Sequence, residues 1–456
     1  MEQQLFRLKK NLQKLIKKNS HILVAFSGGK DSVCLLNLLL NIKKEFNLKI
    51  SVAYINHNLR GAESDEEEEF VTNYINSLNI SLYKKVIQKE YWASLKKKSV
   101  EMEARKIRYD FFYKIANQNY IDYIATAHHL NDKIETFFIQ ILRAGGIETL
   151  TSIPTKNDKI IRPIINFSKK EIESYIEENK LKYIEDSTNN ENLYKRNIIR
   201  NKIVPLLKEI NPNFEKTFLK LFSNLDEEVY FYKKIINKFY KGILISKNNG
   251  FIVIDKERYD GFDVALKKNI IKLILKKLDF PTKPDKVLFG ETCSQKSKYL
   301  YKKGDFLVKS IGNMLWLINL SKIKSFDKNI TIESFPFHSQ YLDIQIKNTN
   351  EVNPKNNFCI KFDENDLPIK VRQIKNADTF EFDKNKNKSL VKLIKEMRIH
   401  TCLFNQIFVF ENSIGKIIGF WLNNKFFRVS KIFYIEKNKN CLIFDFKSPF
   451  NDKTNK

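Results

Sequence analysis

Short apolar runs alternate with amphipathic stretches over roughly the first 210 residues of the chain. Each apolar run is rich in Ile, Val or Tyr, has the length of a buried strand, and precedes a stretch with helical spacing. These runs predict five strands, at residues 21–26, 49–56, 81–87, 121–127 and 159–165. Such alternation is typical of a parallel sheet with helices on both faces, which binds ligands where its strands end.

The pattern changes after residue 214, and this change divides the chain into predicted domains. Residues 1–20 predict an amphipathic helix that leads into the first strand. Ser168–Glu171 is a capping box that opens another helix, and Pro205 should break or kink a third. Residues 215–280 look helical, 298–320 look like strands joined by Gly turns, and polar 348–357 looks like a linker. A basic helix is expected near 389–397. We therefore expect an α/β parallel-sheet domain, a mostly helical middle domain and a small α+β C-terminal domain, at 1–212, 213–347 and 358–447.

Charge and cysteine content narrow the class of protein. The chain has 80 Lys and Arg against 53 Asp and Glu, a net charge of +27, which favours a polyanionic partner such as nucleic acid. The alternative is a solvated lysine surface that reflects only AT-rich coding. The five Cys never form C-x-x-C, which argues against a zinc site, an iron–sulfur cluster or a disulfide framework. The scattered cysteines fit a reducing cytoplasm, where we expect the protein to be. The chain has no apolar run of about 20 residues, so we expect no membrane span.

The stretch SGGKDS, Ser27 to Ser32, lies between the first predicted strand and a helix. Two glycines let the backbone approach an anion, and the N–H groups of the loop converge with the helix N-terminus. Ser27 and Ser32 add hydroxyl donors, and Asp31 can hold a Mg²⁺ that bridges phosphates. The spacing is not that of a Walker A motif. The alternative is an ordinary Gly turn, but strand, glycine pair, Asp and helix all fall in register.

Polar groups also follow the second strand and line a later helix. His57 and Arg60 come at the end of the second strand, where His57 could equally be a loop histidine with satisfied hydrogen bonds. Glu101, Arg105 and Arg108 share one helix face by their spacing. They are either a surface Glu–Arg pair or a source of one Arg for a phosphate.

The fourth strand ends at a second group of ionisable residues. His128 follows the strand, and Asp132 and Glu135 lie on successive turns of one helix face. A carboxylate there could hold Mg²⁺ or take a proton from a nucleophile, although capping and helix packing explain part of the pattern and a metal site is not favoured. Farther on, a polar loop leads into a basic helix that carries Arg196 and Arg200.

The loop resembles that of the PP-loop, or N-type, ATP pyrophosphatases, in which S-G-G-x-D-S grips the pyrophosphate of ATP. Over residues 20–212 the motifs SGGKDS, NHNLRG, EMEARKIRY, AHHLNDKIET, IRPI and EDSTNNENLYKRNIIRNKIVPLL together resemble the bacterial tRNA(Ile)-lysidine synthetases. VRQIKNADTFEF and KSLVKLIKEMRIH resemble that family's C-terminal tRNA-binding domain more weakly. The chain departs from the family at four places: Asn131–Asp132 replaces paired Asp, Ala144 interrupts R-G-x-G, Ala377 precedes Asp378, and HTCLFNQIF follows Ile399.

The resemblance implies a ligase that uses ATP and Mg²⁺ to join free L-lysine to C2 of the wobble cytidine of tRNA(Ile) with a CAU anticodon. An adenylated cytidine would be the intermediate, with AMP and pyrophosphate released, and a homodimer is left open. The residues expected to act in catalysis are Asp31, Asp132, Arg105, Arg108 and Arg196. The residues expected to bind ATP are Ser27, Gly28, Gly29, Lys30, Asp31, Ser32, His57 and His128, with Asp31 as the metal ligand.

Three alternatives share some of these features. A PP-loop tRNA 2-thiolation enzyme would need sulfur-handling cysteines, whereas the one Cys near the loop, Cys34, lies on the apolar face of a helix. An amidotransferase-type synthetase would need a glutaminase domain, for which no stretch is a candidate. A non-enzymatic RNA-binding protein would have no need of the intact Ser27–Ser32 loop or of Asp132.

Overall fold

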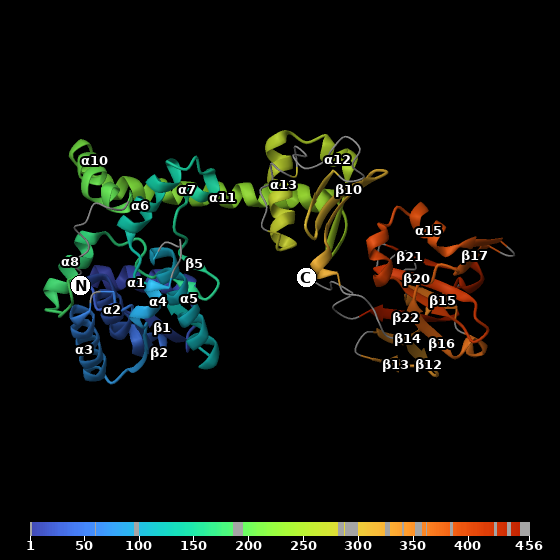
Figure 1. Cartoon of the computed structure of the whole chain (residues 1–456), viewed down its shortest axis with the longest axis horizontal. Coiled ribbons are helices and arrows are strands. Elements are labelled where there is room, and N and C mark those ends of the chain that lie inside the picture. The colour runs from blue at the N-terminus through green and yellow to red at the C-terminus, as the bar shows by residue number, and fades with distance from the viewer. Residues whose placement is uncertain are drawn as a thin grey trace. The chain divides into compact units, whose positions relative to one another are not determined.

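The fold is that of a computed structural model of the chain, drawn in Figure 1. Contacts between Cα atoms divide the chain into two compact units, Met1–Phe231 and Tyr232–Lys456. The structure describes residues 2–59, 61–94, 100–185, 195–280, 287, 300–323, 329–339, 342–351, 358–361, 363–383, 386–423, 426–435 and 439–446.

The first unit contains the predicted strand–helix alternation. Its strands are β1 His21–Ala25, β2 Lys49–Asn56, β3 Ser81–Val86, β4 Tyr123–Ala125, β5 Lys156–Asn157 and β6 Ile160–Ile161. Its helices are α1 Glu2–Leu15, α2 Lys30–Phe46, α3 Ala62–Ser77, α4 Lys89–Ala93, α5 Val100–Gln118, α6 Leu130–Ile141, α7 Ile147–Leu150, α8 Lys169–Glu178, α9 Lys195–Ile198, α10 Val204–Ile210 and the start of α11, Phe214–Ile243. Ser168 and Glu171 form the predicted capping box of α8.

The six strands form one sheet in the order β3-β2-β1-β4-β6-β5, parallel except for β5. β1 shows why the sheet is covered on both faces. Ile22 and Val24 belong to the apolar cluster with α1, α2 and α8, whereas Leu23 belongs to the cluster with α5. Because side chains alternate between the faces of a strand, a continuous apolar run buries both faces. The predicted parallel α/β fold is confirmed.

Pro205 was predicted to break or kink its helix, and the break is not found, whereas the kink stays a prediction. Pro205 lies at the start of α10, directly after a five-residue π-helix, Ile199–Ile203, and α9, the π-helix and α10 are continuous. A proline has no N–H to donate, and the wider π turn accommodates this loss without ending the helix.

The second unit is built on antiparallel sheets. One has the order β7-β8-β11-β10-β9, the others β12-β16-β19-β20-β21, β13-β14-β22-β15 and β17-β18. Strand bounds are β7 Leu244–Asn248, β8 Phe251–Asp255, β9 Tyr301–Lys303, β10 Phe306–Ile311, β11 Met314–Asn319, β12 Ile330–Ile332, β13 Phe337–His338, β14 Leu342–Asn348, β15 Cys359–Lys361, β16 Ile369–Gln373, β17 Thr379–Asp383, β18 Lys386–Ser389, β19 Phe408–Glu411, β20 Ile417–Asn423, β21 Phe426–Val429 and β22 Asn440–Phe446. The helices are α12 Lys256–Asp260, α13 Val264–Lys277 and α15 Leu390–Glu396, the predicted basic helix.

The prediction of helix throughout 215–280 is wrong at the β7–β8 hairpin, whose two-residue turn is Asn249-Gly250. Asn-Gly between apolar runs is a strong hairpin signal, so the sequence did carry the information. The helical segment before it and the α+β part after it agree with the predicted fold class. The three domain boundaries remain predictions, and residues 352–357 of the expected linker lie outside the described residues. Within the described part of the chain, no helix is long and apolar enough to cross a membrane.

Asp378, which follows the departure at Ala377, belongs to a buried ion cluster in the second unit. Arg372 donates from both terminal nitrogens to Asp378, at 2.9 Å each, and from Nε to Glu411 at 2.6 Å. The Arg372 and Asp378 side chains are 13% and 7% exposed. Burial opposes the charge, but the bonds to Asp378 and Glu411 outweigh it and raise the pKa of Arg372. Asp378 therefore has a structural partner within the fold.

We expect Asp378→Ala to lower the free energy of unfolding by about 3 to 5 kcal/mol, because it leaves the Arg372 charge buried with one partner fewer. The control is Lys416→Ala, which removes an exposed partner of Glu381 and should change stability by less than about 1 kcal/mol. Urea unfolding of both variants measures the difference. Equal losses would contradict a structural role for Asp378.

Candidate functional site

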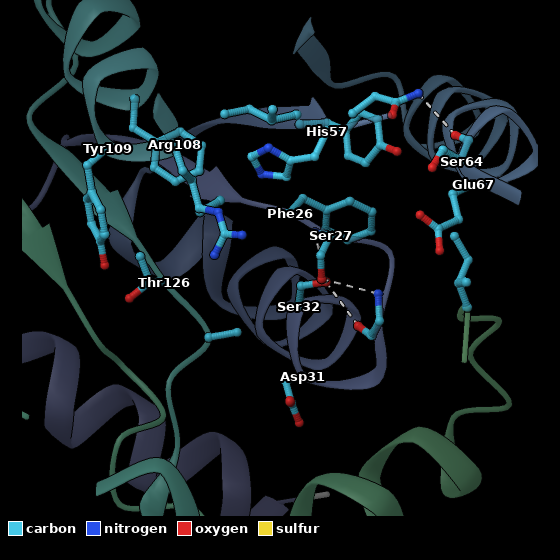
Figure 2. Close-up of a pocket in the computed structure, with 18 of the residues that line it drawn as sticks. Phe26, Ser27, Asp31, Ser32, His57, Ser64, Glu67, Arg108, Tyr109 and Thr126 are labelled. Carbon is cyan, nitrogen blue, oxygen red and sulfur yellow. Dashed lines mark hydrogen bonds between the residues drawn. The ribbon is translucent and has the colours of Figure 1, made fainter. Parts of the chain in front are cut away.

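A cleft of about 530 Å³ opens where β1, β2 and β4 end. Figure 2 shows Ser27 and Ser32 in its middle, Arg108, Tyr109 and Thr126 toward one end, and Ser64 and Glu67 toward the other. The cleft brings together eight residues expected from the sequence: Ser27, Gly29, Asp31, Ser32, His57, Arg108, His128 and Asp132. Four others do not line it: Gly28, Lys30, Arg105 and Arg196.

Hydrogen bonds of the Ser27 and Ser32 hydroxyl groups fix the conformation of the loop between β1 and α2. Ser32 Oγ donates to Gly29 O at 2.9 Å and accepts from the backbone N–H of Ser27 at 3.2 Å. Gly28 has a φ of +82°, which L side chains rarely adopt, and a Cβ there would lie 2.8 Å from Ile184 Cδ1. The loop thus sets the N-terminus of the 17-residue helix α2 at the cleft, where a helix binds anions.

Two carboxylates of the cleft meet at one buried histidine, His129, which is only 5% exposed. Its Nε2 lies 3.6 Å from Asp31 Oδ2 and 3.6 Å from Asp132 Oδ2, which is electrostatic contact beyond hydrogen-bond length. The ring Nδ1 of His129 accepts from the backbone N–H of Asn131, and the backbone N–H of His129 donates to Asp132 Oδ2 at 3.0 Å. His129 therefore caps α6. Sequence reasoning missed His129, although an Asp three residues after a capping position was a readable signal.

Two arginines from the segment after the sheet hold the other side of Asp132. Arg196 donates to Glu135 at 2.7 Å and to Asp132 at 3.3 Å, and Arg200 donates to Glu135 at 2.6 Å. The Glu135 side chain is 2% exposed, so its charge depends on these partners. Burial acts to raise the pKa of Asp132, but the charges of His129 and Arg196 outweigh it and lower that pKa. Asp132 is therefore an ionised carboxylate at neutral pH.

His57 and His128 are neutral groups of the cleft wall. Burial, with the charge of Arg108, lowers the pKa of His57 to about 4. Burial lowers the pKa of His128 to about 4, and Arg162 and Arg196 add to this effect while Asp132 opposes it. His128 Nδ1 is 2.9 Å from Thr126 Oγ1, whereas neither ring nitrogen of His57 has a hydrogen-bond partner among the described residues. Both ring nitrogens of His57 are thus buried polar atoms without a hydrogen-bond partner beside the cleft.

The two arginines of α5 are placed differently. Arg108 lines the cleft and has no carboxylate partner within the described part of the chain. Arg105 lies over the ring of Tyr109, with its guanidinium carbon 5.0 Å from the ring centroid. Of the two, Arg108 is the cation available to an anion in the cleft. Arg60, the side chain of Glu101 and residues 186–194 of the last motif lie outside the described residues.

The structure also adds residues that the sequence did not single out. Asn56 is 2% exposed and donates to Ser64 O at 3.1 Å, while its Oδ1 accepts from the Asn58 N–H at 2.7 Å. This network fixes the end of β2. Glu67, from α3, faces the same cleft (Figure 2). Asn56 opens the NHNLRG motif, whereas Glu67 belongs to none of the motifs because it reaches the cleft only through the packing of α3 beside β2.

Among the described residues, no group of three His, Cys, Asp or Glu is arranged to hold a metal ion. Asp31 alone faces the cleft from the helix N-terminus, with its side chain 46% exposed. One carboxylate fits Mg²⁺, because this ion is usually bound through one or two carboxylates together with substrate phosphates and waters. The donor set therefore fits a metal that arrives with a phosphate ligand.

Residues 1–207 match the model of the ATP_bind_3 family, a PP-loop domain. The tRNA(Ile)-lysidine synthase of Thermosipho africanus is 42% identical over 223 residues, 49% of this chain and 52% of that protein. The tRNA(Ile)-lysidine synthase of Porphyromonas gingivalis is 37% identical over 220 residues, 48% of each chain. This chain thus spans about half the length of the curated relatives it matches. A solved U34-tRNA thiolase, NcsA from Methanococcus maripaludis, has a TM-score of 0.43 at 17% identity, covering 50% of this chain and 78% of that one.

We expect Gly28→Ala to lower the free energy of unfolding by about 1 to 2 kcal/mol or more, since it combines a positive φ with overlap on Ile184. Gly146→Ala is the matched control. Its Cβ would meet nothing within 4 Å, so the change should stay within about 0.5 kcal/mol. Urea unfolding compares the two, and an equally small effect at Gly28 would refute the close packing.

Stability should fall as the pH drops from 6.5 toward 4, because the unfolded chain then binds protons that His57 and His128 refuse in the folded state. The contribution is fully present above pH 6.5 and is worth about 1.4 kcal/mol per unit of pKa shift before solvent screening. The raised pKa of His129 changes stability with pH in the opposite direction. Both proteins in the test therefore keep His129 and differ only at residue 128. His128→Gln should show a shallower loss of urea midpoint over this range than the unaltered chain. An identical slope would contradict a neutral His128.

Proposed function

We propose that the chain is a tRNA(Ile)-lysidine synthase of the PP-loop class, which ligates lysine to a tRNA and consumes ATP. The tRNA would be tRNA(Ile) with a CAU anticodon and the target atom C2 of its wobble cytidine. The observation that carries the proposal is the meeting, in one cleft, of Ser27, Gly29 and Ser32 from the loop after β1 with the carboxylates of Asp31 and Asp132.

The first step would be adenylation of the cytidine. Its O2 attacks the α-phosphorus of ATP, the bond to the β-phosphate breaks, and pyrophosphate leaves. The N–H groups at the start of α2, with Ser27 and Ser32, are placed to stabilise the charge of the departing group. Asp31 would hold Mg²⁺, which neutralises phosphate charge when bound. Arg108, without a carboxylate partner in the described chain, would supply the remaining positive charge.

The second step would be attack of the lysine ε-amine on C2, with AMP as the leaving group. The amine must lose a proton before it attacks. Asp132 has a lowered pKa, so it suits the task of attracting and orienting the ammonium better than that of a strong base. Its position between His129 and Arg196 fixes where its oxygens point. Arg196 would act through Asp132, because its guanidinium is already bonded to Glu135 and Asp132.

The net charge of +27 suits binding of the tRNA backbone by the part of the chain that follows the PP-loop domain. A wobble base lies in a single-stranded loop and must be turned out into the pocket, which requires contacts to the surrounding RNA backbone. We propose that residues after 213 supply such contacts, in a cytoplasmic enzyme. A thiolation enzyme is less well supported, because burial raises the pKa of the Cys34 thiol and no described Cys lines the cleft.

The test is to incubate the protein with ATP, Mg²⁺, labelled lysine and a tRNA(Ile) transcript with a CAU anticodon. We expect label in the RNA, with one AMP and one pyrophosphate formed per lysine; release of ADP would reject the proposal. Asp132→Asn should lower incorporation by about 100-fold or more, as loss of a key electrostatic group does. Asp110→Asn, an exposed carboxylate of α5, is the control and should retain activity. Near-normal turnover by Asp132→Asn would reject its assignment.

A further inference from the structure

A three-residue segment from outside the sheet lies along the phosphate loop. The N–H of Ile184 donates to Gly28 O at 2.9 Å, and Ile184 forms an isolated parallel bridge with Gly29. The Ile184 side chain fills the space over Gly28, where a Cβ would be only 2.8 Å from its Cδ1. Ile184 also lines the cleft. Tyr183–Glu185, called the supporting segment below, thus lies against the turn through one β-bridge and the Ile184 side chain.

Lys30, between Gly29 and Asp31, fastens the same segment by its side chain. Its Nζ lies over the Tyr183 ring, 4.9 Å from the centroid, and 3.5 Å from Glu185 Oε1. The turn and the supporting segment are therefore joined by the main chain at Gly29 and Ile184, and by the Lys30 side chain, which contacts both Tyr183 and Glu185. Partial burial opposes the charge of Lys30, but Tyr183 and Glu185 outweigh it and raise its pKa.

This geometry conflicts with the simplest use of a lysine in a phosphate loop. A phosphate-binding lysine presents its ammonium to the ligand, as a point charge. Asp31 and Gly29, its neighbours, line the cleft, whereas Lys30 does not. Its head is paired instead with an acidic side chain on the supporting segment.

We propose that Lys30 is a positioning residue: with Tyr183 and Glu185 it clasps the supporting segment onto the Gly28-Gly29 turn and so sets the affinity of the loop for the triphosphate of ATP. The inference rests on the proposed function, because it takes ATP to be the ligand. It concerns a residue between the motif's fixed positions, so it describes this chain and not PP-loops in general.

The clasp and a direct phosphate contact predict opposite signs for one variant. Glu185→Lys places two like charges together and opens the clasp, so ATP should bind about two- to fivefold more weakly. If Lys30 contacted the phosphates, or if only the local field mattered, the added positive charge would leave ATP binding unchanged or strengthen it. Lys30→Glu should weaken binding under both interpretations.

The experiment measures the ATP dissociation constant of the full chain, by calorimetry at constant ionic strength, for Lys30→Glu, Glu185→Lys and the double exchange. Under the clasp both single variants lose affinity and the double exchange recovers most of it. Lys44→Glu, an exposed change of equal charge in the last turn of α2, is the control and should bind ATP as the unaltered chain does. Urea unfolding of every variant separates loss of affinity from loss of folding.

The outcomes are distinct. If the unaltered chain binds no ATP, the proposed function fails before the clasp is tested. If it binds ATP and Glu185→Lys binds equally or more tightly, or the double exchange remains as weak as Lys30→Glu, the clasp is overturned. Weakening by Glu185→Lys with recovery in the double exchange supports it.

Discussion

The buried carboxylate of Glu135 is the constraint on which the site depends. With its side chain 2% exposed, it lies beside two arginines, and removing them would leave this carboxyl group buried without a partner of opposite charge. Arg196 and Arg200 come from the segment that follows the sheet, and Glu135 comes from α6, whose N-terminus lies at the end of β4. Satisfying one buried charge therefore brings the basic helix to the cleft and, through Arg196, fixes Asp132.

The electrostatics of the cleft separate two kinds of group. Asp132 is kept ionised on the side of α6, where the charges of His129 and Arg196 lower its pKa. The two histidines of the wall are kept neutral, His57 by burial and Arg108, His128 mainly by burial. Such a cleft can bind an anion at the loop and a cation at Asp132, because the groups that attract each of them lie at different places. A ligation of two substrates of opposite charge requires this separation.

The phosphate loop shows how a strained turn is maintained by packing. Gly28 has a positive φ, which residues with a side chain rarely adopt, and Ile184 fills the space that a side chain at this position would occupy. The loop hydroxyls then bond within the loop, so its geometry exists before any ligand arrives. Preorganisation of this kind reduces the ordering that binding would otherwise have to drive.

The sequence by itself determined the parallel sheet, the turn at Ser27–Ser32 and the capping box at Ser168, because periodicity, glycine placement and capping are local properties of the chain. It also placed Asp31 and Asp132 at strand ends, which meet at one edge of a parallel sheet. Only the tertiary structure decided the partners. Lys30 turns to Glu185 and His129 joins two carboxylates. Spacing along a chain tells which face a side chain occupies, but its partner comes from a distant segment that only folding brings near.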